Sequence, residues 1–336
     1  MYYDELSATI DHLLQDGKGI LAADESNGTI GKRFDTIDVE NNADNRRNYR
    51  LLLATTPELE NYISGAILYE ETFQNKDIHN ISVPQLLLDK GILPGIKVDK
   101  GLSTLANTHD EKITLGLDDL SERLVMFKNQ GAKFAKWRNV YNISEFTPSL
   151  TAMKAGAETL ARYAATCQSV GLVPIVEPEI LMDGNHTIEQ CAEASEMVLH
   201  EVFNALFIHQ VELEHIVLKP SMVTCGKNAA QFSSPEEIAD YTLSVFRNCV
   251  FPAVPTINFL SGGQSPQQAT ANLNAMNSSG YQPWALSFSY GRALQEDCLA
   301  VWKGQQDNVP AAQAALLHRA RLNSLACFGE YSSSME

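Results

Sequence analysis

The sequence of 336 residues lacks any long hydrophobic run, since none approaches the roughly 18 residues that a membrane-spanning helix requires. Its first residues, MYYDELSATIDHLL, include acidic residues and lack the basic and then apolar pattern of a secretion signal. Positive charge is scarce as well: 25 Lys and Arg against 41 Asp and Glu give a formal net charge of −16 at pH 7. This balance argues against nucleic acid or an anionic membrane as a partner, and we expect a soluble, cytoplasmic protein that binds anions only where basic side chains gather.

Cysteine is also sparse, and no C-x-x-C pair or Cys/His spacing typical of a zinc site is present. The spacing gives no sign of a disulfide framework, so we expect the cysteines to be small buried hydrophobic residues. The six cysteines are Cys167, Cys191, Cys225, Cys249, Cys298 and Cys327.

Short apolar runs rich in β-branched residues alternate with longer stretches of helical periodicity. The candidate strands are 19–24, 63–70, 93–99, 132–138, 172–179, 215–220, 253–261 and 285–290. Eight strand–helix repeats without a flexible linker predict an α/β fold, a single (β/α)8 TIM barrel with a parallel eight-stranded sheet. We expect one domain over residues 1–336, with a short tail from about residue 329. A doubly wound sheet is the alternative, but 22–26 (AADES) stands where its glycine-rich turn would be expected.

Three of the connecting segments have clear helical periodicity: 149–169, 187–208 and 235–248. Two of them begin with sequences typical of a capped helix start, Thr187-Ile188-Glu189-Gln190 and Ser234-Pro235-Glu236-Glu237.

Polar residues cluster at or just beyond the ends of the predicted strands, where a buried parallel strand would otherwise be apolar. They are Asp24, Glu70, Lys97, Asp99, Lys136, Arg138, Glu177, Glu179, Lys219, Ser261 and Arg292. In a barrel these ends converge on one mouth, which is where active sites are built. Any single strand-end acid could simply reach solvent or form an interior ion pair, but so many at successive strands favour a site.

Three of these residues are lysines, Lys97, Lys136 and Lys219. Ammonium groups that share a cleft lower one another's pKa, and partial burial lowers it further. A lysine that is neutral near neutral pH is the nucleophile that Schiff-base chemistry requires.

Two glycine-containing turns predict a phosphate site. Ser261-Gly262-Gly263 follows the seventh strand and Gly291-Arg292 follows the eighth, and each turn opens a helix. Loops at these positions commonly bind phosphate in barrels, through backbone N–H groups and a nearby arginine. A second basic set of Lys32, Arg33, Lys97 and Arg138 could hold another phosphate, although Lys32-Arg33 could equally be a solvated helix face.

At these residues the sequence resembles the class I fructose-bisphosphate aldolases, from about Leu6 to about Tyr331. The resemblance is carried by seven segments in the order of the family: 19–26 (GILAADES), 95–101 (GIKVDKG), 134–138 (FAKWR), 174–181 (PIVEPEIL), 218–220 (LKP), 259–265 (FLSGGQS) and 287–294 (SFSYGRAL).

The resemblance implies a TIM-barrel enzyme that cleaves fructose 1,6-bisphosphate reversibly to dihydroxyacetone phosphate and glyceraldehyde 3-phosphate, without metal or cofactor. Lys219 matches the imine-forming lysine, Glu177 its proton shuttle with Glu179 beside it, Asp24 the base for the C4 hydroxyl, and Lys136 the second lysine. Two phosphate sets are also implied. The C1 set is Ser261, Gly262, Gly263, Gly291 and Arg292, and the C6 set is Arg33, Lys97 and Arg138, with Ser26 nearby. The family commonly forms homotetramers, and the expected partners are sugar phosphates.

Three departures from the family pattern concern the ends of the chain and one internal position. The N-terminus is shorter than in animal members, and Thr29 stands where serine is frequent. The long C-terminal tail that ends in tyrosine has no counterpart, because Tyr331 stands too early. We therefore expect another residue or the substrate's own phosphate to exchange the proton at C3.

Two other functions are weighed against this one. One is a different Schiff-base barrel, such as a transaldolase or a deoxyribose-phosphate aldolase; a single phosphate site would suit those enzymes better, so the second basic set argues against them. The other is an aldolase-like protein retained for binding or scaffolding, in which loss of Lys219, Glu177 or Asp24 would be expected; all three are present. A metal-dependent aldolase would need a histidine cluster, but the eight histidines are dispersed, and His209 and His215 are expected to be ordinary helix-end and strand-start residues.

Overall fold

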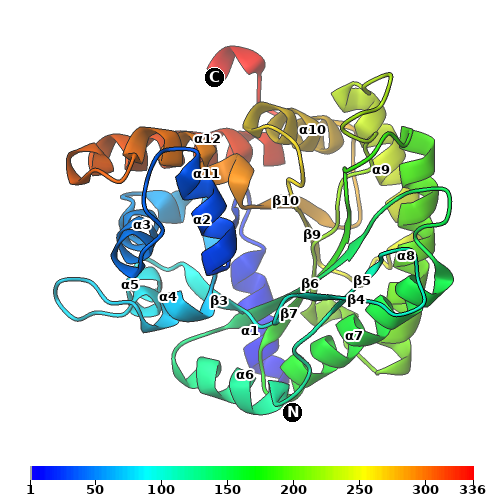
Figure 1. Ribbon diagram of the computed structural model, residues 1–336, viewed down its shortest axis with the longest axis horizontal. Helices are drawn as coiled ribbons and strands as arrows, with labels where there is room; N and C mark the ends of the chain where they lie inside the picture. The colour runs from blue at the N-terminus through cyan, green and yellow to red at the C-terminus, as the bar shows by residue number, and fades with distance from the viewer. Residues whose placement is uncertain (1) are drawn as a thin grey trace.

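The computed structural model describes residues 2–336 and contains a closed barrel of eight parallel strands surrounded by helices (Figure 1). The strands follow one another around the barrel in the order β1-β10-β9-β8-β7-β6-β3-β2. Their bounds are β1 Gly19–Ala23, β2 Ile63–Leu68, β3 Leu93–Lys97, β6 Phe134–Tyr141, β7 Val173–Ile180, β8 Val217–Leu218, β9 Thr256–Phe259 and β10 Ala285–Tyr290. This confirms the predicted TIM barrel.

Most predicted strands agree with the structure to within three residues at either end. The eighth, β10, has the predicted bounds, whereas β8 is only two residues long, so Lys219 stands just beyond its end. The prediction that Glu70 ends the second strand is wrong, because the chain turns at Tyr69 and Glu70 is the first residue of helix α4. The sequence also gave no sign of the antiparallel hairpin of β4 (Leu102–Thr104) and β5 (Lys112–Thr114), which lies between β3 and β6 in the chain.

The helices form the outer layer (Figure 1). They are α1 Tyr3–Leu13, α2 Asn27–Asp35, α3 Ala43–Thr55, α4 Glu70–Gln74, α5 Val83–Asp89, α6 Leu120–Asn129, α7 Leu150–Ser169, α8 Ile188–Ile208, α9 Pro235–Cys249, α10 Pro266–Ser278, α11 Arg292–Trp302 and α12 Val309–Cys327. Both predicted caps are present: Thr187 and Gln190 form a capping box on α8, and the hydroxyl of Ser234 accepts a hydrogen bond from the N–H of Glu237. Each satisfies an N–H that the first helical turn would otherwise leave unpaired.

Helix α1 packs against the barrel interior at the end opposite the site. Its apolar residues Leu6, Ile10 and Leu13 form one buried cluster with strand residues such as Ile20 and Ile67. The spacing of these three positions places them on one face of a helix. Because this end of the barrel is filled, the interior is accessible only from the ends of the strands that carry the polar residues.

Phe134, on β6, occupies barrel space that two glycines leave empty. A Cβ built on Gly95 would lie 2.1 Å from the Phe134 ring, and one built on Gly65 would lie 3.0 Å from it. Because Phe134 is fully buried, its truncation to alanine would cost about 3–5 kcal/mol of stability. The ring and the two glycines therefore form one packing unit inside the barrel.

The cysteines behave as predicted: all six are free thiols, and all are buried except Cys327, which is partly buried. Within the described residues, none of the helices combines the length and the apolar composition needed to cross a membrane.

Candidate active site

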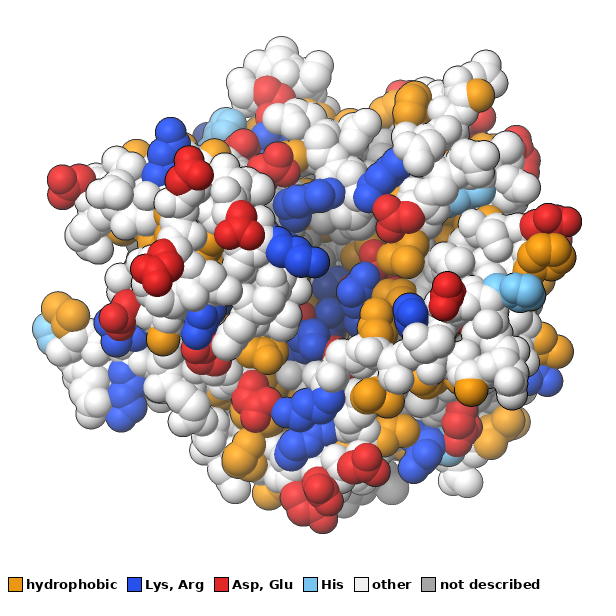
Figure 2. Space-filling view, in the orientation of Figure 1, with side chains coloured by type: hydrophobic (Ala, Val, Ile, Leu, Met, Phe, Trp, Pro, Cys, Tyr) orange, Lys and Arg blue, Asp and Glu red, His pale blue; other side chains and the backbone are white. Residues whose placement is uncertain are grey.

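A cavity of about 560 Å³ opens at the carboxyl ends of the barrel strands and contains most of the predicted site residues. Figure 2 shows Lys and Arg side chains gathered in and around this central hollow, although the protein as a whole is acidic. The cavity has the size of a small-molecule site. Its lining includes Asp24, Ser26, Arg33, Lys97, Lys136, Arg138, Glu177, Glu179, Lys219, Ser261, Gly262, Gly291 and Arg292.

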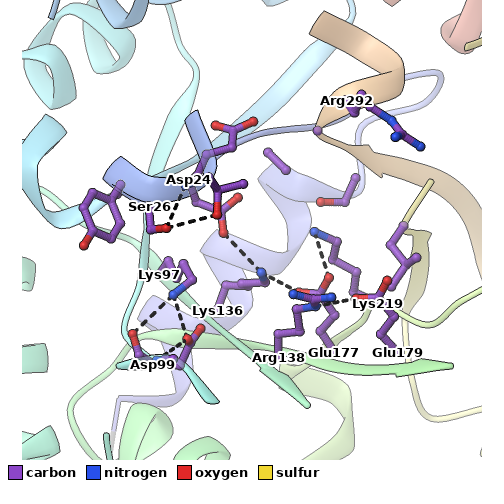
Figure 3. A pocket seen from close by; sticks show the side chains of 18 of the residues that line it. Asp24, Ser26, Lys97, Asp99, Lys136, Arg138, Glu177, Glu179, Lys219 and Arg292 are labelled. Carbon is purple, nitrogen blue, oxygen red and sulfur yellow. Dashed lines mark hydrogen bonds and ion pairs between the residues drawn. The ribbon is translucent and has the colours of Figure 1, made fainter. Parts of the chain in front are cut away.

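Lys136 lies at the centre of the cavity between two carboxylates (Figure 3). Its Nζ is 3.1 Å from Oδ2 of Asp24 and 2.8 Å from Oε2 of Glu177, and all three side chains are buried. The carboxylates come from β7 and from the residue after β1, so the barrel itself brings them together. A buried ammonium is stable only with such partners, and these two hold Lys136 in its charged form.

Lys219 lies within reach of the same Glu177. Its Nζ is 3.5 Å from Oε1 of Glu177, while Oε2 of that carboxylate faces Lys136. One carboxylate therefore bridges two lysines, one from β6 and one just after β8. This places a group that can carry a proton beside both amines.

The pKa values of the two lysines shift in opposite directions. Burial lowers the pKa of Lys219, and the charge of Lys136 lowers it further against the opposing effect of Glu177. Burial also acts to lower the pKa of Lys136, but Asp24 and Glu177 outweigh it and raise that pKa above its ordinary value. For Asp24, burial alone would raise the pKa, but Lys136 and Lys219 hold it below its usual range. The cavity thus favours a neutral Lys219 beside a charged Lys136.

One side of the cavity, which we call the Arg138 end, is formed by Ser26, Lys97, Asp99, Arg138 and Glu179. Lys97 Nζ lies 2.6 Å from Oδ1 of Asp99, and Arg138 Nε donates to Oε2 of Glu179. Lys97 is on β3, Arg138 on β6 and Glu179 on β7. Both strong cations of this end are therefore already paired with a carboxylate.

The opposite side, which we call the Arg292 end, is formed by Ser261, Gly262, Ser289, Gly291 and Arg292. In the closed order of strands, β10 lies across the barrel from β6, and β9 lies across from β3. Arg292 donates from Nη2 to the carbonyl of Gly262 at 3.2 Å, and within residues 2–336 it forms no ion pair with a carboxylate. No side chain in the described chain caps α11, so its first N–H groups are available to an anion.

Ser289 and Glu25 are among the cavity residues that sequence reasoning missed. Ser289, on β10, is 1% exposed and its Oγ has no hydrogen-bond partner in the described part of the chain. A buried polar atom of this kind is rare without a ligand or water. Glu25 is also buried and receives hydrogen bonds from Arg33, Arg50 and Gln295. A signal for Ser289 exists in the sequence, because Ser287 and Ser289 are two polar residues that share one face of a predicted buried strand. Glu25 has no such signal, because its partners are distant in the sequence.

The structure places three of the predicted residues, Gly263, Arg33 and Ser26, more closely than the sequence does. Gly263 lies behind the cavity, lining a neighbouring groove rather than the cavity itself. Arg33 lies beside the Arg292 end, since a Cβ built on Gly291 would be 3.7 Å from its Nη2. Ser26 caps α2 by accepting from the N–H of Thr29 at 3.3 Å, so its hydroxyl faces the cavity at a helix start.

Across residues 2–336, no group of three or more His, Cys, Asp or Glu is arranged to hold a metal ion. His209 pairs with Glu158, and His215 is buried between Ser7 and Glu212 at the other end of the barrel.

Known proteins share the sequence and the fold of this chain over nearly its whole length. A sequence model of the family described as fructose-bisphosphate aldolase class-I matches residues 5–336. The chain is 52% identical over 330 residues to fructose-bisphosphate aldolase 2 of Caenorhabditis elegans, covering 98% of this chain and 90% of that protein. It is also 52% identical over 335 residues to the chloroplastic fructose-bisphosphate aldolase 3 of Arabidopsis thaliana, covering 100% and 85%.

A solved structure is similarly close: fructose-bisphosphate aldolase from Plasmodium falciparum, crystallised with TRAP and a small-molecule inhibitor. It matches this structure with a TM-score of 0.97 at 48% sequence identity and covers 99% of this chain and 96% of that one. The whole length of the chain, and not only its barrel, is therefore shared with these proteins, and the chain belongs to the class-I fructose-bisphosphate aldolase family.

Proposed function

We propose that this chain cleaves fructose 1,6-bisphosphate reversibly to dihydroxyacetone phosphate and glyceraldehyde 3-phosphate through an imine on Lys219. The observation that carries the proposal is the pair of buried lysines that share Glu177, with Nζ–Oε distances of 3.5 Å from Lys219 and 2.8 Å from Lys136. Of the two, only Lys219 has its pKa lowered, and a neutral amine is the form that attacks a carbonyl.

In the first half of the reaction, the neutral amine of Lys219 attacks the C2 ketone of the sugar. Glu177 takes up a proton that enters from solvent through the open cavity and gives it to the departing hydroxyl, so that water leaves and a protonated imine forms. Glu177 is suited to this role because its two oxygens face the two lysines, so a proton can pass along the carboxylate.

In the second half, the protonated imine accepts the electron pair of the breaking C3–C4 bond. Asp24 takes the proton of the C4 hydroxyl, glyceraldehyde 3-phosphate leaves, and an enamine stays on Lys219. Asp24 is ionised and can therefore accept this proton, and Lys136 lies 3.1 Å from it, where its charge stabilises the developing alkoxide. Protonation at C3 and hydrolysis of the imine then release dihydroxyacetone phosphate.

The two ends of the cavity suit the two phosphates of this substrate. We assign the C1 phosphate to the Arg292 end, including the orphan hydroxyl of Ser289, and the C6 phosphate to Ser26, Lys97 and Arg138. Arg33 lies beside Gly291, and we therefore assign it to the C1 phosphate rather than to the C6 set. Glu179 pairs with Arg138, which suggests that it orients this arginine rather than reacting with substrate.

Borohydride trapping with dihydroxyacetone phosphate, followed by mass mapping of the labelled peptide, tests the imine. We expect the label on Lys219 alone and none in a Lys219→Ala variant. A label on Lys136, or no label in the parent enzyme, would contradict the mechanism. Full activity in excess EDTA is expected as well, since the imine supplies the electron sink that a metal would otherwise provide.

Three finer features are also proposals. We infer that residues 1–336 act as one domain, that the active form is a homotetramer, and that the protein works in the cytoplasm on sugar phosphates. Sedimentation velocity of the purified protein tests the assembly, and imaging of the tagged full-length protein tests the compartment. Imaging is needed because the chloroplastic relative from Arabidopsis thaliana is as similar to this chain as the relative from Caenorhabditis elegans.

A further inference from the structure

A buried hydrogen-bond network behind the Arg292 end centres on Glu25, the residue between Asp24 and Ser26. The Glu25 side chain is 5% exposed and collects donors from three helices: Arg33 on α2, Arg50 on α3 and Gln295 on α11. None of the roles assigned above explains a fully buried carboxylate at this position. Burial acts to raise the pKa of Glu25, but Arg33 and Arg50 outweigh it and lower that pKa, so the group is an anion.

The two oxygens of Glu25 are divided between the two arginines. Oε2 accepts from Nη1 of Arg50 at 2.7 Å, while Oε1 accepts from Nη1 of Arg33 and, at 3.0 Å, from Nε2 of Gln295. Arg50 also donates from Nη2 to the backbone carbonyl of Glu25 at 3.2 Å. Arg50 itself is only 4% exposed, and it does not line the cavity.

This division leaves part of the Arg33 guanidinium unused. A free arginine and a free carboxylate prefer a bidentate pair with two parallel N–H···O bonds. Here Arg33 engages Glu25 through Nη1 on Oε1, while Oε2 accepts from Arg50. Its Nη2 lies beside Gly291, and the Arg33 side chain lines the cavity and remains 23% exposed.

We propose that Arg50 is a positioning residue: by occupying Oε2 of Glu25, it prevents a bidentate Arg33–Glu25 pair and keeps Nη2 of Arg33 available to the substrate phosphate. Gln295, on α11, also helps to keep Nη2 of Arg33 available, because it donates to the other oxygen of Glu25. Its Nε2 is shared between Oε1 of Glu25 and the carbonyl of Ala22 at 2.7 Å, and its Oε1 accepts from Tyr49. This inference rests on the proposed function, because it assumes that a phosphate binds at this end.

The test compares Arg50→Met with two substitutions on the same helix. Arg47→Met removes an exposed arginine, and Arg46→Met removes a half-buried one whose Nε and Nη2 pair with Glu71 at 2.8 Å. We expect Arg50→Met to raise KM for fructose 1,6-bisphosphate about tenfold, the low end for a hydrogen bond to a charged group, with a smaller change in kcat. Arg46→Met and Arg47→Met should leave KM unchanged. A loss of thermal stability in Arg50→Met with unchanged KM would mean that Arg50 is only structural and would overturn the proposal.

A second variant removes the competition for Arg33. In Arg50→Met/Glu25→Gln, no carboxylate remains to capture Arg33, so KM should return to within about twofold of the parent value, since a neutral amide forms a weaker pair with arginine. Replacing a buried ion pair by neutral groups is often tolerated, which keeps this test available if Arg50→Met alone does not fold. A double variant with KM as high as that of Arg33→Met would refute the proposed competition.

The readout also separates this inference from the function on which it rests. Borohydride trapping of each variant is measured against the concentration of dihydroxyacetone phosphate and, separately, of unphosphorylated dihydroxyacetone. Arg50→Met should raise the concentration of dihydroxyacetone phosphate that trapping requires, and should leave the concentration of unphosphorylated dihydroxyacetone unchanged. If the parent protein forms no imine, the proposed function fails; if it does and both ligands respond alike, the positioning role alone fails.

Discussion

The two ends of the cavity differ in whether their cations are paired with carboxylates. At the Arg138 end, Lys97 and Arg138 are each paired with a carboxylate that comes from the same strand end or from the next strand. At the Arg292 end, Arg292 donates only to a backbone carbonyl, and a buried serine hydroxyl and an uncapped helix start lie beside it.

The difference predicts unequal binding at the two ends. A phosphate at the Arg138 end must compete with Glu179 and Asp99 for its cations, which offsets part of the gain. A phosphate at the Arg292 end meets Arg292, which pairs with no carboxylate in residues 2–336, and Arg33, which pairs with Glu25 through Nη1. The charge-assisted hydrogen bond from Arg292 is therefore gained almost in full. We therefore expect the Arg292 end to contribute more to substrate affinity.

The largest expected effect is that of Lys219→Met, which should abolish cleavage while leaving both ends of the cavity in place. No other neutral amine lies within reach of the carbonyl, because Lys136 is held charged by Asp24 and Glu177. Isothermal titration should still detect binding of fructose 1,6-bisphosphate, which makes this variant the background for comparing the two ends without turnover. Residual cleavage of more than a trace would mean that another group forms the imine.

Next in size is Lys136→Met, which removes the cation between the two ends. We expect kcat to fall about 100-fold or more, as for the loss of a group that assists proton transfer. Imine formation requires neutral Lys219, so its rate decreases as pH falls through the pKa of that residue. Without Lys136, Asp24 and Glu177 act on Lys219 alone and raise its pKa. The acidic limb of the rate of imine trapping should therefore move to higher pH; a shift to lower pH would contradict the assigned electrostatics.

Substitution of Arg292 tests the stronger end directly. In the Lys219→Met background, Arg292→Met should weaken binding of fructose 1,6-bisphosphate about tenfold or more, since a hydrogen bond to a charged group is worth about 1.5–3 kcal/mol. Dihydroxyacetone phosphate and fructose 1-phosphate should lose affinity by a similar factor. Titration of the three ligands measures this, and an effect confined to the bisphosphate would place the C1 phosphate elsewhere.

The smallest effect is expected for Arg138→Met. Because the charge of Arg138 is already partly neutralised by Glu179, its loss should weaken binding of fructose 1,6-bisphosphate by only about fivefold, or about 1 kcal/mol. Fructose 1-phosphate, which lacks the second phosphate, should bind unchanged. If Arg138→Met proved more damaging than Arg292→Met, the proposed inequality of the two ends would be wrong.

Much of this site could be predicted from sequence because a barrel turns a linear pattern into a spatial one. Lys136, Glu177 and Lys219 each stand at or near the end of an apolar run, and the strand order brings these ends together. The sequence could not show which lysine would be charged, since that depends on Lys136 having two carboxylates within 3.1 Å and Lys219 only one within 3.5 Å.

What sequence reasoning missed has a common physical cause. The apolar run before Glu70 predicts a strand that ends at this residue, but the chain turns one residue earlier into α4. Arg50 and Gln295 meet at Glu25 from helices that lie 25 and 270 residues away in the chain. Such contacts are set by tertiary packing, which local periodicity does not report.

The packing of Phe134 against Gly65 and Gly95 has a consequence for how this barrel can change over evolutionary time. The space is shared so tightly that a methyl group added at Gly95 would overlap the ring. A lineage that gains a side chain at Gly95 must shrink Phe134 in the same step, so we expect these two positions to covary among relatives, whereas a side chain at Gly65 would meet Leu13 first, at 2.8 Å. Covariation of side-chain size inside the barrel would then reflect packing constraints alone, separately from the selection that acts on the active-site residues.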